Sequence, residues 1–342
     1  ERCSASVPDP LRIVEEHLEN LPGDVLDPRS FPLYSESQYA QAEFPYVAFD
    51  PAIPHPWLRG QWLGDEKPVW VPATLTYLAM DIRREQLFAQ GSSNGLAAGT
   101  TFEDAAIRAV LELVERDAFM CAWLLKKPGQ RIALDHTSAP ELRSILSGLQ
   151  AFGARTELLL IPSVCDFPAI LALAFGDGVS YPGVTLGLGT HPDPRVALRQ
   201  AILELGQTGP YLRRLMINKT YPVPDTYRDV REMKDHAAYY FPQERASAFD
   251  FLLADSSEVR LAELPNRTDY SLPAIASALA KAAIRVALID VTASGLMASP
   301  LRVVRALSPD LQPIHFGYGM DRLPVGRLGT VSIRPNDLTP IW

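Results

Sequence analysis

The chain has 342 residues, of which 47% are hydrophobic and 21% are charged, a composition typical of a globular protein with a sizeable core. Its formal net charge of -8 at pH 7 and its lack of a long basic run argue against a nucleic-acid partner. Proline and aspartate interrupt the most apolar stretch, residues 158 to 175, so we expect no membrane span. No signal peptide opens the chain, and the default expectation is a cytoplasmic location.

The first 60 residues are rich in proline. Apart from a short helix expected over Leu11 to Leu21, this composition predicts an extended segment that wraps around the rest of the protein. The next expected element is a strand over Val69 to Leu78. Because this strand contains a proline, we place it at a sheet edge or a bulge.

A long helix is expected to begin at Thr101, after the glycine-containing run Ser93 to Thr101. Thr101 as N-cap and Asp104 three residues later form a capping-box pattern. Lys126 and Lys127 suit the last turn, and Pro128-Gly129 suits its end. The sequence therefore predicts one helix of unusual length with a buried apolar stripe.

Acidic residues and one arginine share a polar strip beside that stripe: Asp104, Glu112, Glu115 and Arg116. Glu112 and Glu115 lie one turn apart, so their carboxylates point the same way and can hold a hard divalent cation. The guanidinium of Arg116 can bind a phosphate oxygen. The alternative is an ordinary solvated helix face with ion pairs, which is the commoner meaning of such a triplet.

Three further strands are expected at residues 157 to 162, 169 to 175 and 183 to 188, in an antiparallel or mixed sheet. A second helix is expected to open at Asp193-Pro194, because an N-cap residue is followed by proline at the first helical position. It carries Glu204 and Gln207 on one face. We expect it to end before Gly209-Pro210.

The last third of the chain predicts a layered α and β arrangement. Residues 210 to 268 contain both charged and aromatic residues, and we interpret this stretch as an insertion or lid. The expected elements that follow are a helix over Ala274 to Arg285, a strand over Val286 to Val291, a helix capped by Ser299-Pro300 and a strand over Leu311 to Phe316.

Together these motifs resemble the YcaO superfamily of ATP-dependent enzymes that modify peptide backbones. The family's Asn-Gly-x-Ala-Ala-Gly turn, Glu-x-x-Glu-Arg-Asp-Ala helix and Glu-x-x-Gln helix are matched by Asn94 to Gly99, Glu112 to Ala118, and Glu204 with Gln207. Glu1 and Arg2 match the end of an earlier Glu-x-x-Glu-Arg motif, whose first acid would precede residue 1. Later landmarks also match: Ile289 to Thr292, Leu311 to Pro313 and Gly326 to Leu328.

The resemblance implies an α+β, YcaO-like layered fold of sheets and helices, with an ATP site built from carboxylate-bearing helices. It implies one domain over residues 1–342, made of a wrapping segment (1–60), a nucleotide-site lobe (61–209), the insertion or lid (210–268) and a C-terminal α/β part (269–342). The implied cofactors are ATP and Mg2+. The implied metal ligands are Glu1, Glu112 and Glu115, and the implied ATP-binding residues are Arg2, Asp104, Glu112, Glu115, Arg116, Glu204 and Gln207.

By the same resemblance, the expected reaction is cyclodehydration of Cys, Ser or Thr to azolines in a ribosomally made precursor peptide. A partner protein in trans is expected to bind the leader peptide, and a homodimer is plausible from the family. The tail from Pro335 to Trp342 lacks the alternating prolines of many azoline-forming members. Macroamidine formation and thioamide formation therefore stay open as alternatives. A non-catalytic scaffold that binds a peptide or partner also stays open, because the first acid of the earlier motif is not in this sequence.

Overall fold

The computed structural model describes residues 1–134, 140–323 and 328. The chain divides into two compact units. Unit 1 comprises Glu1–Arg116, Tyr270–His315 and Arg322–Thr330, and unit 2 comprises Asp117–Asp269, Phe316–Asp321 and Val331–Trp342. In the part of the chain that is described, no helix has both the length and the apolar character needed to cross a bilayer. The single domain and its four segments stay a prediction.

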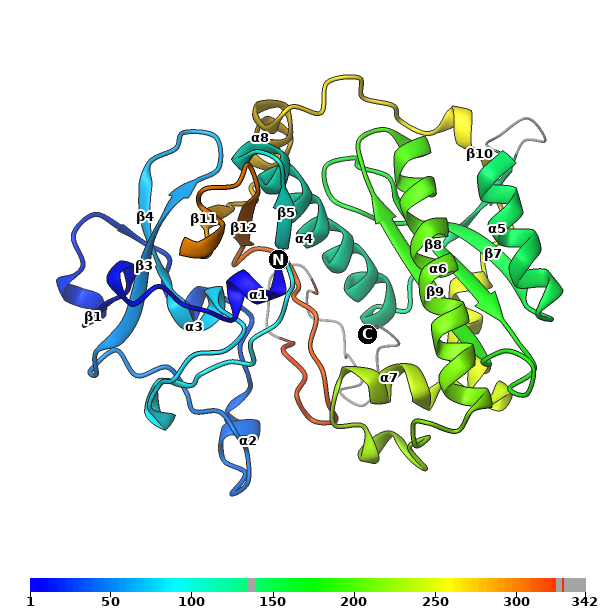
Figure 1. Ribbon diagram of the computed structural model, residues 1–342, viewed down its shortest axis with the longest axis horizontal. Coiled ribbons are helices and arrows are strands. Elements are labelled where there is room, and N and C mark those ends of the chain that lie inside the picture. Colours follow the sequence, from blue (N-terminus) through cyan, green and yellow to red (C-terminus); the bar gives the residue numbers. More distant parts are fainter. Residues whose placement is uncertain (135–139, 324–327, 329–342) are drawn as a thin grey trace. The chain divides into compact units, whose positions relative to one another are not determined.

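Unit 1 is built on a mixed sheet (Figure 1). Within the described residues its strand order is β2-β4-β3-β11-β12-β5, and β1 pairs with β3 outside this path. The pairing of β2 with β4 is parallel, and the other pairings are antiparallel. The strands are β1 Val14–Glu16, β2 Asp24–Val25, β3 His55–Trp62, β4 Pro68–Pro72, β5 Leu96–Gly99, β11 Ala287–Asp290 and β12 Arg302–Leu307.

Short helices and one long helix accompany this sheet. The short helices are α1 Arg2–Ala5, α2 Glu36–Tyr39, α3 Ala73–Thr76 and α8 Leu272–Lys281. The long helix is α4 Phe102–Leu124, which belongs to unit 1 as far as Arg116. The central strands β3 and β4 are strongly buried: Trp57, Leu58, Val69 and Val71 are each 0% exposed. The apolar stripe predicted for α4 is confirmed, since Val110, Val114 and Ala118 are also fully buried.

Several predictions for unit 1 are wrong at the level of single elements. Residues 11 to 21 form no α-helix. They form β1 between two 3-10 turns, Pro10–Arg12 and Leu18–Asn20. The strand expected over Val69 to Leu78 stops at Pro72, where α3 begins, and the Thr76 hydroxyl donates to the Pro72 carbonyl at 2.9 Å. Pairing with β3 therefore decides the backbone conformation around Val14 more strongly than local propensity does.

The elements expected after Val291 are also wrong. Ser299-Pro300 does not cap a helix, because β12 follows it directly and only a 3-10 turn, Ser294–Leu296, precedes it. Residues 311 to 316 contain no strand. The strand β12 lies between β11 and β5 and pairs with both. The β-branched pair Val303-Val304 suits that central position.

Unit 2 contains a second sheet, with the order β10-β6-β7-β8-β9 among the described residues. Its central pairings are antiparallel, and β10 runs parallel to β6. The three strands predicted here are confirmed as β7, β8 and β9. The strands are β6 Gln130–Ala133, β7 Arg155–Ile161, β8 Ala169–Phe175, β9 Val184–Thr190 and β10 Glu258–Arg260.

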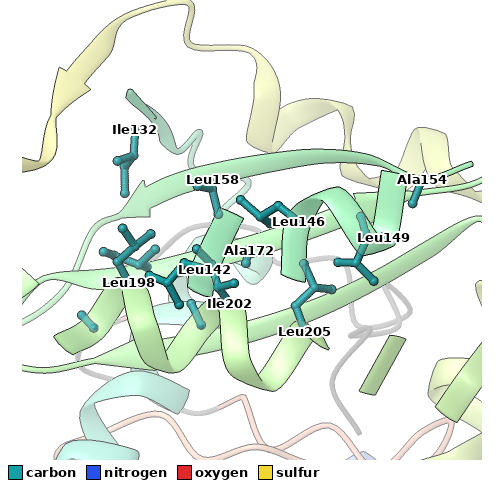
Figure 2. Close-up of a cluster of buried hydrophobic side chains, with 14 of the residues drawn as sticks. Ile132, Leu142, Leu146, Leu149, Ala154, Leu158, Ala172, Leu198, Ile202 and Leu205 are labelled. Atoms are coloured by element: carbon teal, nitrogen blue, oxygen red, sulfur yellow. The ribbon is translucent and has the colours of Figure 1, made fainter. Parts of the chain in front are cut away.

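Two helices, α5 Pro140–Ala151 and α6 Pro194–Ile217, supply the apolar side chains that pack on this sheet. Figure 2 shows this cluster, with Leu142 and Leu146 of α5 lying near Ile202 and Leu205 of α6. Because these side chains recur at steps of three and four residues, each helix presents one continuous apolar stripe to the strands.

The stretch from residue 210 to 268 contributes to the interior of unit 2. Phe241, Phe249 and Leu252 are at most 2% exposed, and the helix α7 Met233–Tyr239 lies in the same stretch. The expected end of α6 before Gly209-Pro210 is wrong, since the helix continues through Pro210 to Ile217. A Cβ at position 209 would lie 2.0 Å from the Tyr181 hydroxyl, so glycine is required there by packing and does not mark a helix end.

Candidate functional site

The start of α4 is fixed by the capping residues that the sequence predicts. The Asp104 amide donates to the Thr101 hydroxyl at 3.0 Å, and the Asp104 carboxylate accepts from the Thr100 amide at 3.2 Å. Arg108 donates to the same carboxylate at 2.9 Å and thereby lowers its pKa. Asp104 thus takes part in capping and in a local ion pair, and its role in ATP binding stays a prediction.

The polar strip of α4 is confirmed as a cluster of partly buried charges. The side chains of Glu112, Glu115 and Arg116 are 25%, 15% and 15% exposed. Nε of Arg116 lies 3.8 Å from Glu112 Oε1 and 4.0 Å from Glu115 Oε1. One guanidinium therefore lies within ion-pair distance of both carboxylates. Because the side chains are partly buried, the electrostatic attraction between them is stronger than it would be in water.

A second arginine, which the sequence analysis did not single out, lies near this strip. Arg305 of β12 is 3% exposed and donates to the carbonyl oxygens of Ser92 at 2.7 Å and Leu75 at 2.9 Å. Burial lowers the pKa of Arg305 to about 10, and the negative charge of Glu112 opposes that shift. The signal in the sequence was a charged residue inside an apolar strand, which is rare unless the charge has a role.

The glycine run before α4 forms a turn followed by a strand. Gly95 has φ +75°, and a Cβ there would lie 2.6 Å from the Ala306 carbonyl oxygen and 2.7 Å from Leu113 Cδ2. Leu96–Gly99 forms β5, which pairs with β12. Glycine at position 95 therefore lets the chain approach both β12 and α4, which places Asn94, 9% exposed, beside Arg305 in a shared hollow.

The N-terminal residues Glu1 and Arg2 are exposed, at the start of the four-residue helix α1. Within the described residues, no group of three or more acidic, histidine or cysteine side chains is arranged as a metal site. Glu112 and Glu115 form a pair only, so a Mg2+ ion held by them would need further oxygen ligands, which phosphate and water commonly supply. The roles of Glu1 and Arg2 stay predictions.

On α6, Glu204 is held by the backbone of the neighbouring strand. Its carboxylate accepts a hydrogen bond of 2.5 Å from the Leu188 amide of β9. Helix and strand approach closely because β9 has glycine on both sides of Leu188. A Cβ at Gly187 would lie 2.3 Å from the Ala201 carbonyl oxygen, and one at Gly189 would lie 2.1 Å from the Ala197 carbonyl oxygen. Gln207, one turn after Glu204, is exposed.

The predicted site residues therefore fall into two groups. Glu112, Glu115 and Arg116 form one cluster in unit 1, and Arg305 belongs to the same unit. Glu204 and Gln207 share one side of α6 in unit 2. The landmark residues Gly326 and Arg327, and the tail from Pro335 to Trp342, lie outside the described residues.

Comparison with known proteins gives one family match and several matches to solved structures. The model of the YcaO family, described as a cyclodehydratase that binds ATP and Mg2+, matches residues 1–312. An uncharacterized protein of Methanothermobacter thermautotrophicus is 26% identical over 155 residues, which are 44% of this chain and 40% of that protein. The chain thus spans about two fifths of the length of that relative.

Two solved structures illustrate the similarity of fold. A heterocyclase in complex with substrate and cofactor matches with a TM-score of 0.76 and 22% identity, over 91% of this chain and 42% of that one. YcaO from Methanopyrus kandleri, bound with AMPPCP and Mg2+, matches with a TM-score of 0.65 and 22% identity, over 91% of this chain and 73% of that one. These matches confirm the predicted mixture of sheets and helices.

Proposed function

The chain belongs to the YcaO family, and from this premise we propose that it activates peptide backbone amides by O-phosphorylation with ATP and Mg2+. The observation that carries the proposal is the cluster on α4. Two partly buried carboxylates one turn apart share a guanidinium within 4.0 Å. Such a set offers oxygen ligands to a divalent cation and a charged donor to a phosphate.

The residues present suit these ligands chemically. Glu112 and Glu115 would hold Mg2+, with Glu1 as a third carboxylate. Arg116 and Arg2 would orient phosphate oxygens, and Asp104, Glu204 and Gln207 would complete the nucleotide site. The 2.5 Å hydrogen bond from Leu188 to Glu204 supports this role, because it fixes the direction of that carboxylate before any ligand binds.

The reaction needs activation because an amide carbon is a poor electrophile. ATP supplies a phosphoryl group that converts the amide oxygen into a leaving group, with ADP as the other product. The protein's own part is to position the groups and to neutralise charge. Arg116 can stabilise charge on phosphate oxygens, and its partial burial strengthens that effect. Attack by a Cys, Ser or Thr side chain then closes an azoline ring and releases inorganic phosphate.

The substrate proposed is a ribosomally made precursor peptide, presented with the help of a leader-binding partner in trans. The heterocyclases among the similar structures support ring formation as the first outcome to test. Macroamidine formation and thioamide formation use the same backbone activation with a different nucleophile. A scaffold that only binds peptide is the non-enzymatic alternative.

The test incubates the protein with ATP, Mg2+ and a library of peptides containing Cys, Ser or Thr, and measures ADP release and peptide mass together. Ring closure predicts ADP release coupled to loss of one water from the peptide. Exchange of oxygen for sulfur in the presence of sulfide would identify thioamide formation instead. ADP release that no peptide stimulates, with unchanged peptide masses, would contradict the proposal.

A further inference from the structure

Unit 1 contains a small hollow of about 40 Å3 that is lined in part by residues just before β5. Two buried arginines line it, Arg305 at 3% exposure and Arg322 at 4%, together with the buried Asn94. The remaining lining comes from β12 and the residues that follow it, from the segment before β5, and from Phe31, Leu75 and Leu113. This volume exceeds that of a single water site, so the hollow can hold a compact group.

The charge of Glu112 acts on Arg305, but within the described part of the chain the two arginines at this hollow have no carboxylate in direct contact. Arg305 donates to two carbonyl oxygens, and Arg322 donates through Nε to the Pro32 carbonyl at 2.8 Å. Among the described residues, neither guanidinium has a carboxylate within the 4.0 Å that defines an ion pair. Buried charges are ordinarily paired, because the loss of hydration is otherwise uncompensated.

Two polar atoms facing this region also lack a partner in the described structure. They are Nε of Arg305 and Oδ1 of Asn94. The Arg305 Nε–H group is a donor, and the Asn94 amide presents either its oxygen or its NH2 group, depending on which way it is turned. Burial and the positive charge of Arg322 both lower the pKa of Arg305, so the two cations are close enough to repel each other.

We propose that this hollow is a binding site for a compact inorganic anion, no larger than phosphate, held between the guanidinium groups of Arg305 and Arg322 with the Asn94 amide. An anion there supplies the missing countercharge and accepts the unpaired Nε–H of Arg305. It also joins β12 to the chain segment of Arg322 and to the turn before β5. This proposal does not depend on nucleotide binding.

The test uses the whole chain without nucleotide, in a buffer whose anions are too large for the hollow, such as gluconate. Sodium chloride, sodium bromide or sodium phosphate replaces gluconate at constant ionic strength, and the thermal unfolding midpoint is recorded. A ligand that binds only the folded state raises the midpoint with a saturable dependence on its concentration. Saturation by halide alone identifies a halide site, and saturation by phosphate alone identifies an oxyanion site.

Two variants and one crystal experiment make the result specific. Asn94→Asp places a carboxylate in the hollow, so its midpoint should no longer depend on the added anion. Arg285→Gln is the matched control. It removes an arginine that is paired with Asp310 at the surface of the same unit, and should respond as the wild type does. Crystals of the wild type grown with the anion that raises the midpoint should show that anion between Arg305 and Arg322, by anomalous signal if it is bromide and by a tetrahedral peak if it is phosphate.

The proposal is overturned if neither anion class gives a saturable rise in the wild type, if Asn94→Asp responds as strongly as the wild type, or if the anion that raises the midpoint is absent between the two guanidiniums in the crystal. The crystal experiment needs no variant, so an unstable variant would not leave the question open. Because no nucleotide or peptide is used, a negative result here is also separate from a failure of the proposed enzymatic activity.

Discussion

On α4, Glu112 and Glu115 face the guanidinium of Arg116 at 3.8 and 4.0 Å, whereas on α6, Glu204 accepts a 2.5 Å hydrogen bond from the backbone of β9. The first two carboxylates lie within ion-pair distance of a side chain, and the third accepts a hydrogen bond from the backbone of a strand. A backbone contact between packed elements instead fixes its partner in advance.

The largest effect expected from this difference is on activity. Glu112→Gln and Glu115→Gln each keep the shape of the side chain but remove a metal-binding charge, so kcat for peptide-stimulated ADP release should fall on the order of 100-fold or more. Glu103→Gln, at an exposed position in the first turn of the same helix, is the control and should have near wild-type activity. Unchanged activity in the Glu112 and Glu115 variants would show that these α4 residues are not part of the active site.

The next effect is on the packing that positions Glu204. Gly187→Ala or Gly189→Ala would place a methyl group 2.3 or 2.1 Å from a carbonyl oxygen of α6. We expect each to destabilise the protein by about 1–3 kcal/mol in urea unfolding, because the helix must move away from β9.

Gly148→Ala gives the matched comparison. Gly148 lies in α5, is exposed, and a Cβ there would have no atom within 4 Å. This change should stabilise the protein by about 0.5–1 kcal/mol, since alanine is the better helix former. Equal destabilisation by all three substitutions would show that close approach to β9 is not the cause.

A smaller effect is expected from the N-cap residues of α4 and α6. Thr101→Ala removes the hydroxyl that accepts from the Asp104 amide, and Asp193→Ala removes the carboxylate that accepts from the Arg195 amide at 2.8 Å. Each should cost about 1 kcal/mol of unfolding free energy. If only Asp193→Ala does so, the start of α4 is held by packing, and Thr101 contributes little.

The smallest effect concerns the pH dependence of the Asp104–Arg108 pair. Arg108 lowers the pKa of Asp104 from its ordinary value of 3.8. The stabilisation is therefore complete above pH 3.8 and is lost as the pH falls through the lower pKa of the folded state. Because both side chains are more than a third exposed, we expect about 0.3 kcal/mol, measured as the difference between wild type and Arg108→Ala at pH 7 and at pH 2.5.

The sequence predicts α4, the start of α6 and the strands β7, β8 and β9, because their signals are local. Apolar periodicity identifies α4, and Asp193-Pro194 marks the start of α6. Two of the differences are decided by distant partners. Val14–Glu16 becomes a strand by pairing with β3, and α6 passes through Pro210 because tertiary packing outweighs the lost hydrogen bond.

The candidate site follows the same division. Glu112, Glu115 and Arg116 were predictable, since a spacing of three and four residues on one helix fixes which side chains are neighbours. The contacts of Arg305 and the bond from Leu188 to Glu204 were not predictable, because they join segments that are separate in the sequence. The Gly-Leu-Gly run at 187 to 189 is visible in the sequence, but only the structure shows that these glycines allow α6 to pack closely against β9.

The central claim is that Glu112 and Glu115 bind Mg2+ together with a nucleotide. Isothermal titration of the whole chain with AMPPCP, with and without Mg2+, tests it most directly. We predict saturable heat that requires Mg2+ and that disappears in the variant carrying both Glu112→Gln and Glu115→Gln. Saturable heat of equal size in that variant, or none in the wild type, would contradict the claim.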